Sequence, residues 1–279
     1  MNSAARVGAA VTALFVPGDR PERFAKATGA GADIVIVDLE DAVAPAAKAA
    51  ARQAVRAAMT GPGPLAAVVR VNAAGTEFHD ADLDLLAELS GDAASGLLGV
   101  MLPKAESPTV VECLVGVVGT GRAVVPLVES AVGVLAIDRL ARVPGVTRLA
   151  LGAIDLTADV DADLDSPVVT HAIAQLVLAS RAARIAAPLD SPATAITDLD
   201  AVTAAGARAR ACGFGGKLCI HPAQIDPVRA GFRPSAAQLD WARRMIGAGA
   251  AAVQIDGQMI DKPVIDRARH ILRRAGTDA

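Results

Sequence analysis

Residues 123–155 read AVVPLVESAVGVLAIDRLARVPGVTRLALGAID and hold one complete strand–helix–strand repeat. Residues 123–128 form a short apolar run, residues 133–142 carry a helical pattern, and residues 147–151 form a second, mostly apolar run. Neither run alternates between apolar and polar positions, and each is followed by a polar or glycine residue. This pattern is typical of parallel strands buried on both faces, with the helix as the crossover between them.

The same repeat recurs along the chain and predicts the fold class. Eight short apolar runs are expected to be strands, at residues 12–16, 34–39, 67–71, 97–102, 123–128, 147–151, 185–189 and 217–220. Helical patterns lie between them, at residues 22–28, 48–59, 80–89, 107–118, 133–142, 166–183 and 198–212. Eight strand–helix units fit a (β/α)8 TIM barrel. The alternative, a doubly wound open sheet, usually has fewer strands and a G-x-G-x-x-G turn after the first one, and that turn is missing here.

The domain organisation follows from the position of the eighth strand. We expect residues 1–235 to form the barrel, because no linker or low-complexity segment divides them. Residues 236–279 are expected to form a C-terminal extension that contains a helix and a lid. The apolar stretch at residues 7–16 resembles the core of a signal sequence, but Pro17-Gly18-Asp19-Arg20 follows it, so we read it as part of the first strand.

Composition excludes several classes of function. The chain has 279 residues, of which 53% are hydrophobic, and a formal net charge of −3. This charge does not favour a nucleic-acid partner, which usually requires a basic surface. No run of about 18 apolar residues predicts a membrane span. The three cysteines, Cys113, Cys212 and Cys219, lack the spacing of metal ligands, so we expect a reduced cytoplasmic protein.

Polar residues gather where the predicted strands end, which is where TIM-barrel enzymes place their chemistry. Those at or just after the strand ends are Asp38, Glu40, Asp41, Lys104, Glu129, Asp155, Asp190 and His221. Arg70 lies within the third strand, and burying its charge without a partner would be costly. Converging carboxylates supply that partner, but they would repel one another unless a cation lay among them. Two carboxylate ligands with room for water suit Mg²⁺, and no His/Cys cluster indicates zinc.

Other residues have simpler explanations. Lys104 ends a strand and could form a Schiff base, but neighbouring carboxylates would favour its charged form. Ser130 has no visible His–Asp relay, so a serine nucleophile is not expected. His221 precedes Pro222 and is expected to be a structural hydrogen-bonding residue rather than a base. Three further histidines are expected on the surface: His79, His171 and His270.

Eight segments together carry a family resemblance. They are LFVPGDRPERFAK (14–26), IVDLEDAV (36–43, with Lys48), VRVN (69–72), VMLPKAES (100–107), LVES (127–130), GAIDL (152–156), GFGGKLCIHPAQI (213–225) and GQMID (257–261). They span the chain from start to end. With these segments the chain resembles the citrate lyase beta-subunit-like proteins of the HpcH/HpaI aldolase and malyl-CoA lyase superfamily.

The resemblance implies a TIM barrel, an oligomer that is often a trimer, and Mg²⁺-dependent cleavage or formation of a carbon–carbon bond in 3-hydroxyacyl thioesters. By motif, Glu129 and Asp155 would be the metal ligands, with Glu129 also next to the substrate. Arg70 would bind the substrate carboxylate or carbonyl, and Asp261 would be the catalytic acid/base on a lid, often in a neighbouring subunit's site. The remaining assignments place Asp38, Glu40 and Asp41 around the metal-bound waters, and Arg20 and Lys26 near the phosphates of coenzyme A.

The sequence departs from the family at Ile154, where an acidic or polar residue is common, and in the loop after Asp155. These departures leave the acid substrate open. The main hypothesis is a lyase that splits a malyl- or citramalyl-type CoA thioester into an acyl-CoA and a 2-oxo acid. Alternatives are a citryl thioester lyase that works with citrate lyase subunits and an acyl-carrier protein, and a malyl-CoA thioesterase or malate-synthase-like enzyme. A non-catalytic CoA-binding subunit is a further alternative, against which the intact site residues argue.

Overall fold

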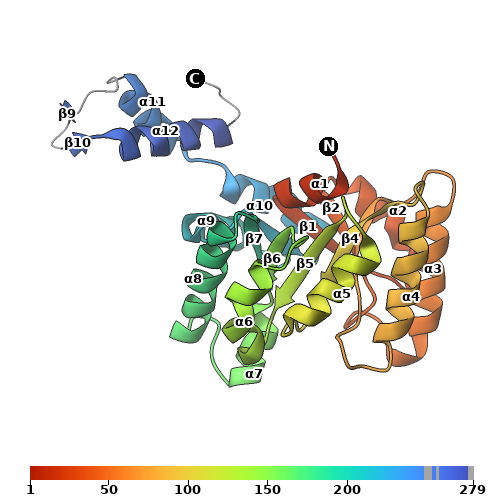
Figure 1. Cartoon of the computed structure of the whole chain (residues 1–279). Coiled ribbons are helices and arrows are strands. Elements are labelled where there is room, and N and C mark those ends of the chain that lie inside the picture. The colour runs from red at the N-terminus through yellow and green to blue at the C-terminus, as the bar shows by residue number, and fades with distance from the viewer. Residues whose placement is uncertain (248–252, 256–257, 276–279) are drawn as a thin grey trace.

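Eight parallel strands form a closed barrel in the computed structural model (Figure 1), which describes residues 1–247, 253–255 and 258–275. The strands are β1 (Thr12–Pro17), β2 (Ile34–Asp38), β3 (Ala67–Arg70), β4 (Leu97–Leu102), β5 (Ala123–Val128), β6 (Arg148–Leu151), β7 (Ala186–Asp190) and β8 (Gly216–Cys219). They pair in sequence order, and β1 closes the ring against β8 through the Thr12–Lys217 register. The predicted (β/α)8 barrel is confirmed, and the open sheet is excluded.

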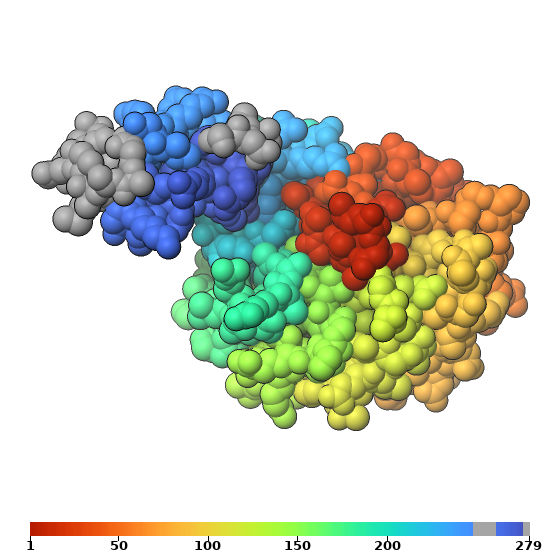
Figure 2. Space-filling view, turned by 45° about the horizontal axis from the view of Figure 1, so that its top comes forward, coloured from red at the N-terminus to blue at the C-terminus, as the bar shows by residue number. Residues whose placement is uncertain are grey.

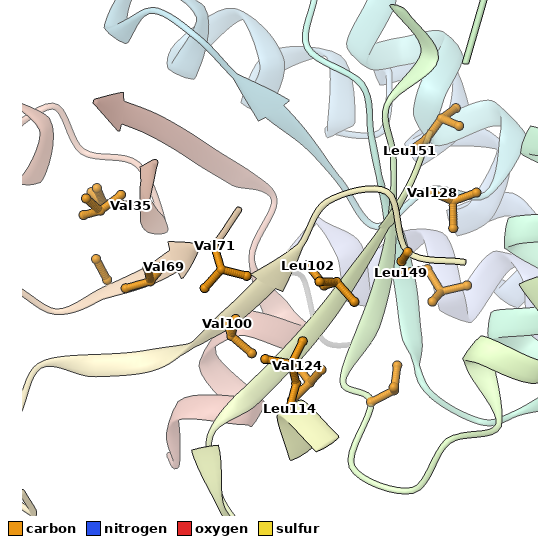
Figure 3. Packing of buried hydrophobic residues seen from close by; sticks show 14 of the residues in the cluster. Val35, Val69, Val71, Val100, Leu102, Leu114, Val124, Val128, Leu149 and Leu151 are labelled. Atoms are coloured by element: carbon orange, nitrogen blue, oxygen red, sulfur yellow. The ribbon is translucent and has the colours of Figure 1, made fainter. Parts of the chain in front are cut away.

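The barrel strands are buried on both faces, which explains their continuous apolar runs. Ile34, Ile36 and Val68 belong to a cluster inside the barrel. Their neighbours Val35 and Val69 belong to a second cluster, which the strands share with the surrounding helices. Figure 3 shows part of this outer layer, where valines and leucines of adjacent strands pack beside Leu114 of the helix after β4. Side chains alternate across a strand, so two apolar layers require apolar residues at every position.

Helices surround the barrel and join its strands. The helices of the barrel are α1 (Ser3–Ala9), α2 (Phe24–Gly29), α3 (Lys48–Thr60), α4 (His79–Gly91), α5 (Pro108–Val118), α6 (Ala131–Ala141), α7 (Ala153–Val160), α8 (Pro167–Ala182), α9 (Leu199–Cys212) and α10 (Ile225–Phe232), with single 3₁₀ turns at Pro21–Arg23, Pro45–Ala47 and Pro222–Gln224. Helices α1, α7 and α10 were not predicted. The loop expected directly after the sixth strand is helix α7. Within the described ranges, no helix has both the length and the apolar content to cross a membrane.

The N-terminal end of the barrel is closed by α1 and a buried arginine. Arg148 is the first residue of β6 and is fully buried. Its Nη1 donates to the carbonyls of Val7 and Ala10, at 3.0 and 2.8 Å, and its Nη2 donates to the carbonyl of Ala187. Val7 and Ala10 also join the apolar cluster inside the barrel. The open end is therefore the one formed by the C-terminal ends of the strands.

The C-terminal segment forms an arm that projects from the barrel (Figures 1 and 2). Its elements are α11 (Ala236–Gly247), β9 (Val253–Ile255), β10 (Gln258–Ile260) and α12 (Lys262–Arg274), with β9 and β10 antiparallel. Helices α11 and α12 pack around an apolar cluster of their own, which includes Met245 and Leu272. Gly257, the first residue of the predicted GQMID segment, lies outside the described residues. The arm lies toward the α1 end of the barrel, whereas α7 lies at the opposite end (Figure 1).

Candidate active site

A cavity of about 400 Å³ lies at the C-terminal ends of the strands. Five of the predicted site residues line it: Asp38, Asp41, Arg70, Glu129 and Asp155. They come from four different strands or the turns after them, so the closure of the barrel brings together residues far apart in the sequence. This is the position at which TIM-barrel enzymes place their active sites.

Arg70 is held rigidly on one side of the cavity. Its Nε and Nη2 donate to the two carboxylate oxygens of Asp38, at 2.7 and 2.6 Å. The guanidinium also lies over the ring of Phe15, with 4.8 Å between Cζ and the ring centroid. Burial alone would lower the pKa of Arg70, but the hydrogen bonds and charge of Asp38 outweigh it and raise this pKa. A two-point ion pair of this kind fixes the orientation of the guanidinium as well as its charge.

Glu40 and Lys104 form a second charged pair next to Arg70. The Nζ of Lys104 donates to Glu40 Oε1 at 2.9 Å, and Arg70 Nη1 lies 3.1 Å from Glu40 Oε2. Glu40 is buried, and burial raises the pKa of its carboxyl despite the nearby Arg70 and Lys104. The charge of Lys104 is favoured, because the bond to Glu40 raises its pKa against the opposing effect of burial. The structure thus supports the charged form of Lys104 rather than a Schiff-base role.

Glu129, which follows β5, is only 3% exposed. Its Oε1 accepts the backbone N–H of Lys104 at 2.8 Å, and Lys104 adopts a left-handed backbone with φ of 46° to present that group. Burial first, and then the charges of Glu40 and Asp155, raise the pKa of Glu129 to about 8. A buried carboxyl with such a shift, in a cavity, is a strong candidate for a functional group.

Gly152 makes the position of Glu129 possible. A Cβ atom at residue 152 would lie 2.4 Å from Glu129 Oε2 and 2.6 Å from Glu129 Cβ. The absence of a side chain therefore lets the carboxylate lie against the backbone at the end of β6. Three residues later, Asp155 occupies the first turn of α7, where the partial positive charge of a helix N-terminus favours a carboxylate.

The charges around the cavity suit a divalent cation. Five carboxylates face the cations Arg70 and Lys104, and the charges of Glu40 and Asp155 repel the carboxylate of Glu129. Among the described residues, no three His, Cys, Asp or Glu side chains are arranged as a closed metal site. A metal held by Glu129 and Asp155 would therefore keep positions for water and substrate, which suits Mg²⁺ better than a metal with an all-protein ligand set. The donor set fits the predicted ion.

A buried lysine, Lys48, holds the backbone of the segment that carries Glu40. The Nζ of Lys48 donates to the carbonyls of Leu39 and Glu40 and to Asn72 Oδ1, at 2.8, 2.7 and 2.6 Å. Asn72 in turn donates its side-chain and backbone N–H groups to Asp82. The bonds of Lys48 fix the backbone at Glu40. Lys48 was expected only as part of the motif that begins at Ile36, without a role of its own.

Four predicted site residues do not line the cavity: Glu40, which lies behind Arg70 in the pair described above, and Arg20, Lys26 and Asp261. Arg20 and Lys26 are exposed, and neither lines the cavity. Asp261 is exposed at the start of α12, where its Oδ1 accepts the backbone N–H of Val264 at 3.3 Å. Asp261 belongs to the arm, which lies toward one end of the barrel, whereas α7, which carries Asp155, lies at the other (Figure 1).

The residues with simpler explanations are placed as follows. The ring of His221 accepts the backbone N–H of Ala223 and caps a 3₁₀ turn, as expected for a structural residue. Ser130 caps α6 and donates to Glu106. His171 and His270 are exposed as predicted. The surface position predicted for His79 is wrong, because His79 is buried and its Nδ1 lies 2.7 Å from the carbonyl of Asn72.

Comparisons with known proteins agree with this architecture. The family model described as HpcH/HpaI aldolase/citrate lyase matches residues 12–222. The chain is 40% identical to a citrate lyase subunit beta-like protein of Mycobacterium tuberculosis, over 94% of each chain. It is 31% identical to a (3S)-malyl-CoA thioesterase of Cereibacter sphaeroides, over 94% of this chain and 93% of that one.

A solved structure extends the likeness to the arm. The crystal structure of CitE from Mycobacterium tuberculosis in complex with magnesium, acetoacetate and coenzyme A superimposes with a TM-score of 0.84 at 39% identity. The match covers 96% of this chain and 99% of that one. The chain therefore belongs to the HpcH/HpaI aldolase/citrate lyase family.

Proposed function

We propose that the protein is a Mg²⁺-dependent carbon–carbon lyase that cleaves, or forms, a 3-hydroxyacyl-CoA thioester of the malyl- or citramalyl-CoA type, with an acyl-CoA and a 2-oxo acid as the other side of the reaction. The observation that carries this proposal is the buried Glu129 and the half-buried Asp155, which line one cavity together with the fixed Arg70. The relative from Mycobacterium tuberculosis, solved with magnesium, acetoacetate and coenzyme A, supports the same ligand classes here.

Glu129 and Asp155 would hold the Mg²⁺ ion. When bound, the ion would supply a Lewis acid for the 3-hydroxyl and the adjacent carboxylate or keto oxygens. The chain would hold the carboxylates of Glu129 and Asp155 in place, so that neither side chain has to move when the ion binds. The Lys104 N–H fixes one oxygen of Glu129, and the lack of a Cβ at Gly152 leaves space for the other.

Arg70 would bind the carboxylate or carbonyl of the oxo-acid part of the substrate. Asp38 occupies Nε and one N–H of Nη2, and Nη1 also lies 3.1 Å from Glu40 Oε2. The second N–H of Nη2 and the N–H of Nη1 that does not face Glu40 would therefore be the donors to substrate. Because Asp38 and the Phe15 ring hold the guanidinium in place, these donors need no reorientation as charge develops on oxygen. Preorganised donors of this kind stabilise oxyanionic transition states.

Asp261 would act as the acid/base of a neighbouring subunit's site. Cleavage produces a thioester enolate, which must receive a proton, and the reverse reaction must remove that proton. The exposed position of Asp261, on an arm that projects from its own barrel, is compatible with delivery to a second copy. Residues 236–279 would then be a lid exchanged between subunits of a homo-oligomer, with a trimer as the expected assembly. Arg20 and Lys26, both free of ion pairs in the described structure, would face the phosphates of coenzyme A.

A coupled assay of the purified protein against malyl-, citramalyl-, methylmalyl- and citryl-CoA tests the reaction. Metal-dependent release of a 2-oxo acid is expected, and Glu129→Ala or Asp155→Ala should each abolish it without unfolding the protein. Full activity in either variant would refute the metal assignment. Asp261→Asn should retain ligand binding and lose turnover by orders of magnitude. Mixing the inactive Glu129→Ala and Asp261→Asn proteins should restore activity if Asp261 acts across subunits, whereas no recovery would refute that arrangement.

A thioesterase is the second candidate, favoured by the relative named (3S)-malyl-CoA thioesterase. In that reaction water would attack the thioester in the same cavity. The products separate the two candidates, because a thioesterase releases free CoA and the intact hydroxy acid, whereas the lyase releases a 2-oxo acid and an acyl-CoA. Free CoA without any 2-oxo acid would favour the thioesterase over the lyase.

A further inference from the structure

The cavity has a wall of apolar side chains that the proposed chemistry does not use. Leu127, Pro192 and Leu218 line it together with Ile154 and Ile220. Each of these two isoleucine side chains lines the cavity and is 46% exposed to solvent. Apolar surface left in contact with water at a binding site favours a ligand that covers it.

The same cavity offers few cations to a substrate. Arg70 is the only cationic residue that lines it in the described structure, and Arg70 is already paired with Asp38. The acidic residues Asp38, Asp41, Glu129 and Asp155 supply the rest of its charge. A substrate with one carboxylate can be held by Arg70 and a metal. A second carboxylate directed at the apolar wall would lose its hydration without gaining a partner, which is costly.

We propose that the enzyme is specific for 2-oxo acids with a single carboxylate and an apolar tail longer than the methyl group of pyruvate. The tail would lie against Ile154 and Ile220, while the oxo-acid head is held next to Arg70. The thioester partner would then carry this tail on its 3-hydroxyl carbon. This inference rests on the proposed function and names the substrate class for the same site.

A second cavity shows where a longer tail would extend. It has a volume of about 310 Å³ and is lined by Ile154 and the apolar Leu164, Val169 and Ile173, and also by the charged Asp190, Arg208 and Lys217. Ala153, Ile154 and Pro192 line both cavities, so this thin layer separates them. Ile154 is therefore in a position to set the length of tail that the site accepts.

Calorimetric titration of the Mg²⁺-loaded protein with 2-oxo acids, in the absence of any thioester, tests the proposal without requiring turnover. Each methylene added from pyruvate to 2-oxobutanoate and 2-oxopentanoate should lower the dissociation constant about fourfold, which is the change expected for burying one CH₂ group. Oxaloacetate should bind roughly tenfold more weakly than pyruvate. Equal affinity along the alkyl series, or tighter binding of oxaloacetate, would overturn the proposal.

Variants of Ile154 locate the specificity. Ile154→Ala should shift the tightest-binding tail by one or two methylenes toward longer acids, because it thins the layer between the cavities. Ile154→Lys should improve oxaloacetate binding at least tenfold by supplying the missing cation. Ile196→Ala is a matched control, because Ile196 is 43% exposed and lines neither cavity. An unchanged length preference in Ile154→Ala would refute the role of this residue.

The titration also separates this inference from the proposed function. If no 2-oxo acid binds in the presence of Mg²⁺, the proposed reaction itself fails. If the acids bind with Mg²⁺ but without dependence on tail length, only the specificity inference fails. In that case the exposed isoleucines would face the thioester rather than the oxo acid.

Discussion

Replacing Glu129 by Gln measures how strongly the metal-free site strains the fold. The pKa of Glu129 is about 8 in the folded protein, against an ordinary value of 4.5. Between these values the folded state keeps a proton that the unfolded chain has lost, so the free energy of unfolding falls as the pH rises. The slope is about 1.4 kcal/mol for each pH unit, and the whole interval costs about 4–5 kcal/mol. Gln carries no ionisable proton and its oxygen can still accept the Lys104 N–H.

Urea denaturation of both proteins in EDTA, at pH 5.5 and pH 8.5, provides the measurement. The stability of Glu129→Gln relative to wild type should increase by about 3 kcal/mol between the two pH values. Added Mg²⁺ should restore the stability of wild type at pH 8.5 and leave the variant unchanged, because ligand binding stabilises only a state that can bind. Glu112→Gln, on the exposed face of α5, is the matched control and should show no such difference.

One result would refute this reasoning. If the difference in stability between wild type and Glu129→Gln is the same at both pH values, Glu129 ionises in the folded protein as it does in water. The burial and the repulsion by Glu40 and Asp155 would then not govern the site, and the argument that a cation is needed there would lose its basis.

Three further predictions test the geometry of the site. Gly152→Ala places a methyl group against the Glu129 side chain and should weaken Mg²⁺ binding at least ~10-fold in a calorimetric titration, with a loss of stability of about 1–3 kcal/mol from overpacking; wild-type affinity would contradict the steric argument. Arg70→Lys keeps the charge but loses the two-point bond to Asp38, so kcat/KM should fall about 100-fold while Mg²⁺ affinity changes little; an unchanged kcat/KM would count against preorganisation. Lys48→Met leaves three buried acceptors without a donor and should lower the free energy of unfolding in urea by about 3 kcal/mol or more, and a change below about 1 kcal/mol would show that water replaces the ammonium.

The barrel could be predicted from the sequence because its strands are apolar at consecutive positions. Burial on both faces leaves this signature, as at Val35 between Ile34 and Ile36, and few other environments do. Helix α7 was missed because its sequence, Ala153–Val160, is short and carries two aspartates, so its pattern resembled a loop. Helix α1 was missed because an apolar stretch next to a strand was read as part of that strand.

The candidate site could be predicted from Arg70, a charged residue in an otherwise apolar strand. Arg148 gives the same pattern in another strand but was not predicted to have a role. Arg70 is the last residue of β3, so it lies at the end of the barrel that carries the carboxylates. Arg148 interrupts β6 in the same way, but as its first residue, and it bonds to backbone carbonyls at the closed end. Position within the strand distinguishes the two.

Other contributions to the site leave no mark in the sequence. The Lys104 N–H bond to Glu129 depends on a left-handed backbone at a non-glycine residue, and the space at Gly152 depends on the distance between two strands. Such features arise only once the chain is folded.

The closure of one end of the barrel by Arg148 and α1 has a kinetic consequence. In the described part of the chain that end is closed, so substrates and products would pass through the opening at the C-terminal ends of the strands. The component held deepest would then enter first and depart last. For the proposed reaction this component is the 2-oxo acid beside Arg70, with the bulkier thioester nearer to solvent. Cleavage should then release the acyl-CoA before the 2-oxo acid, and condensation should follow the reverse order. Product-inhibition kinetics would reveal this obligatory sequence, whereas random release would require a second exit.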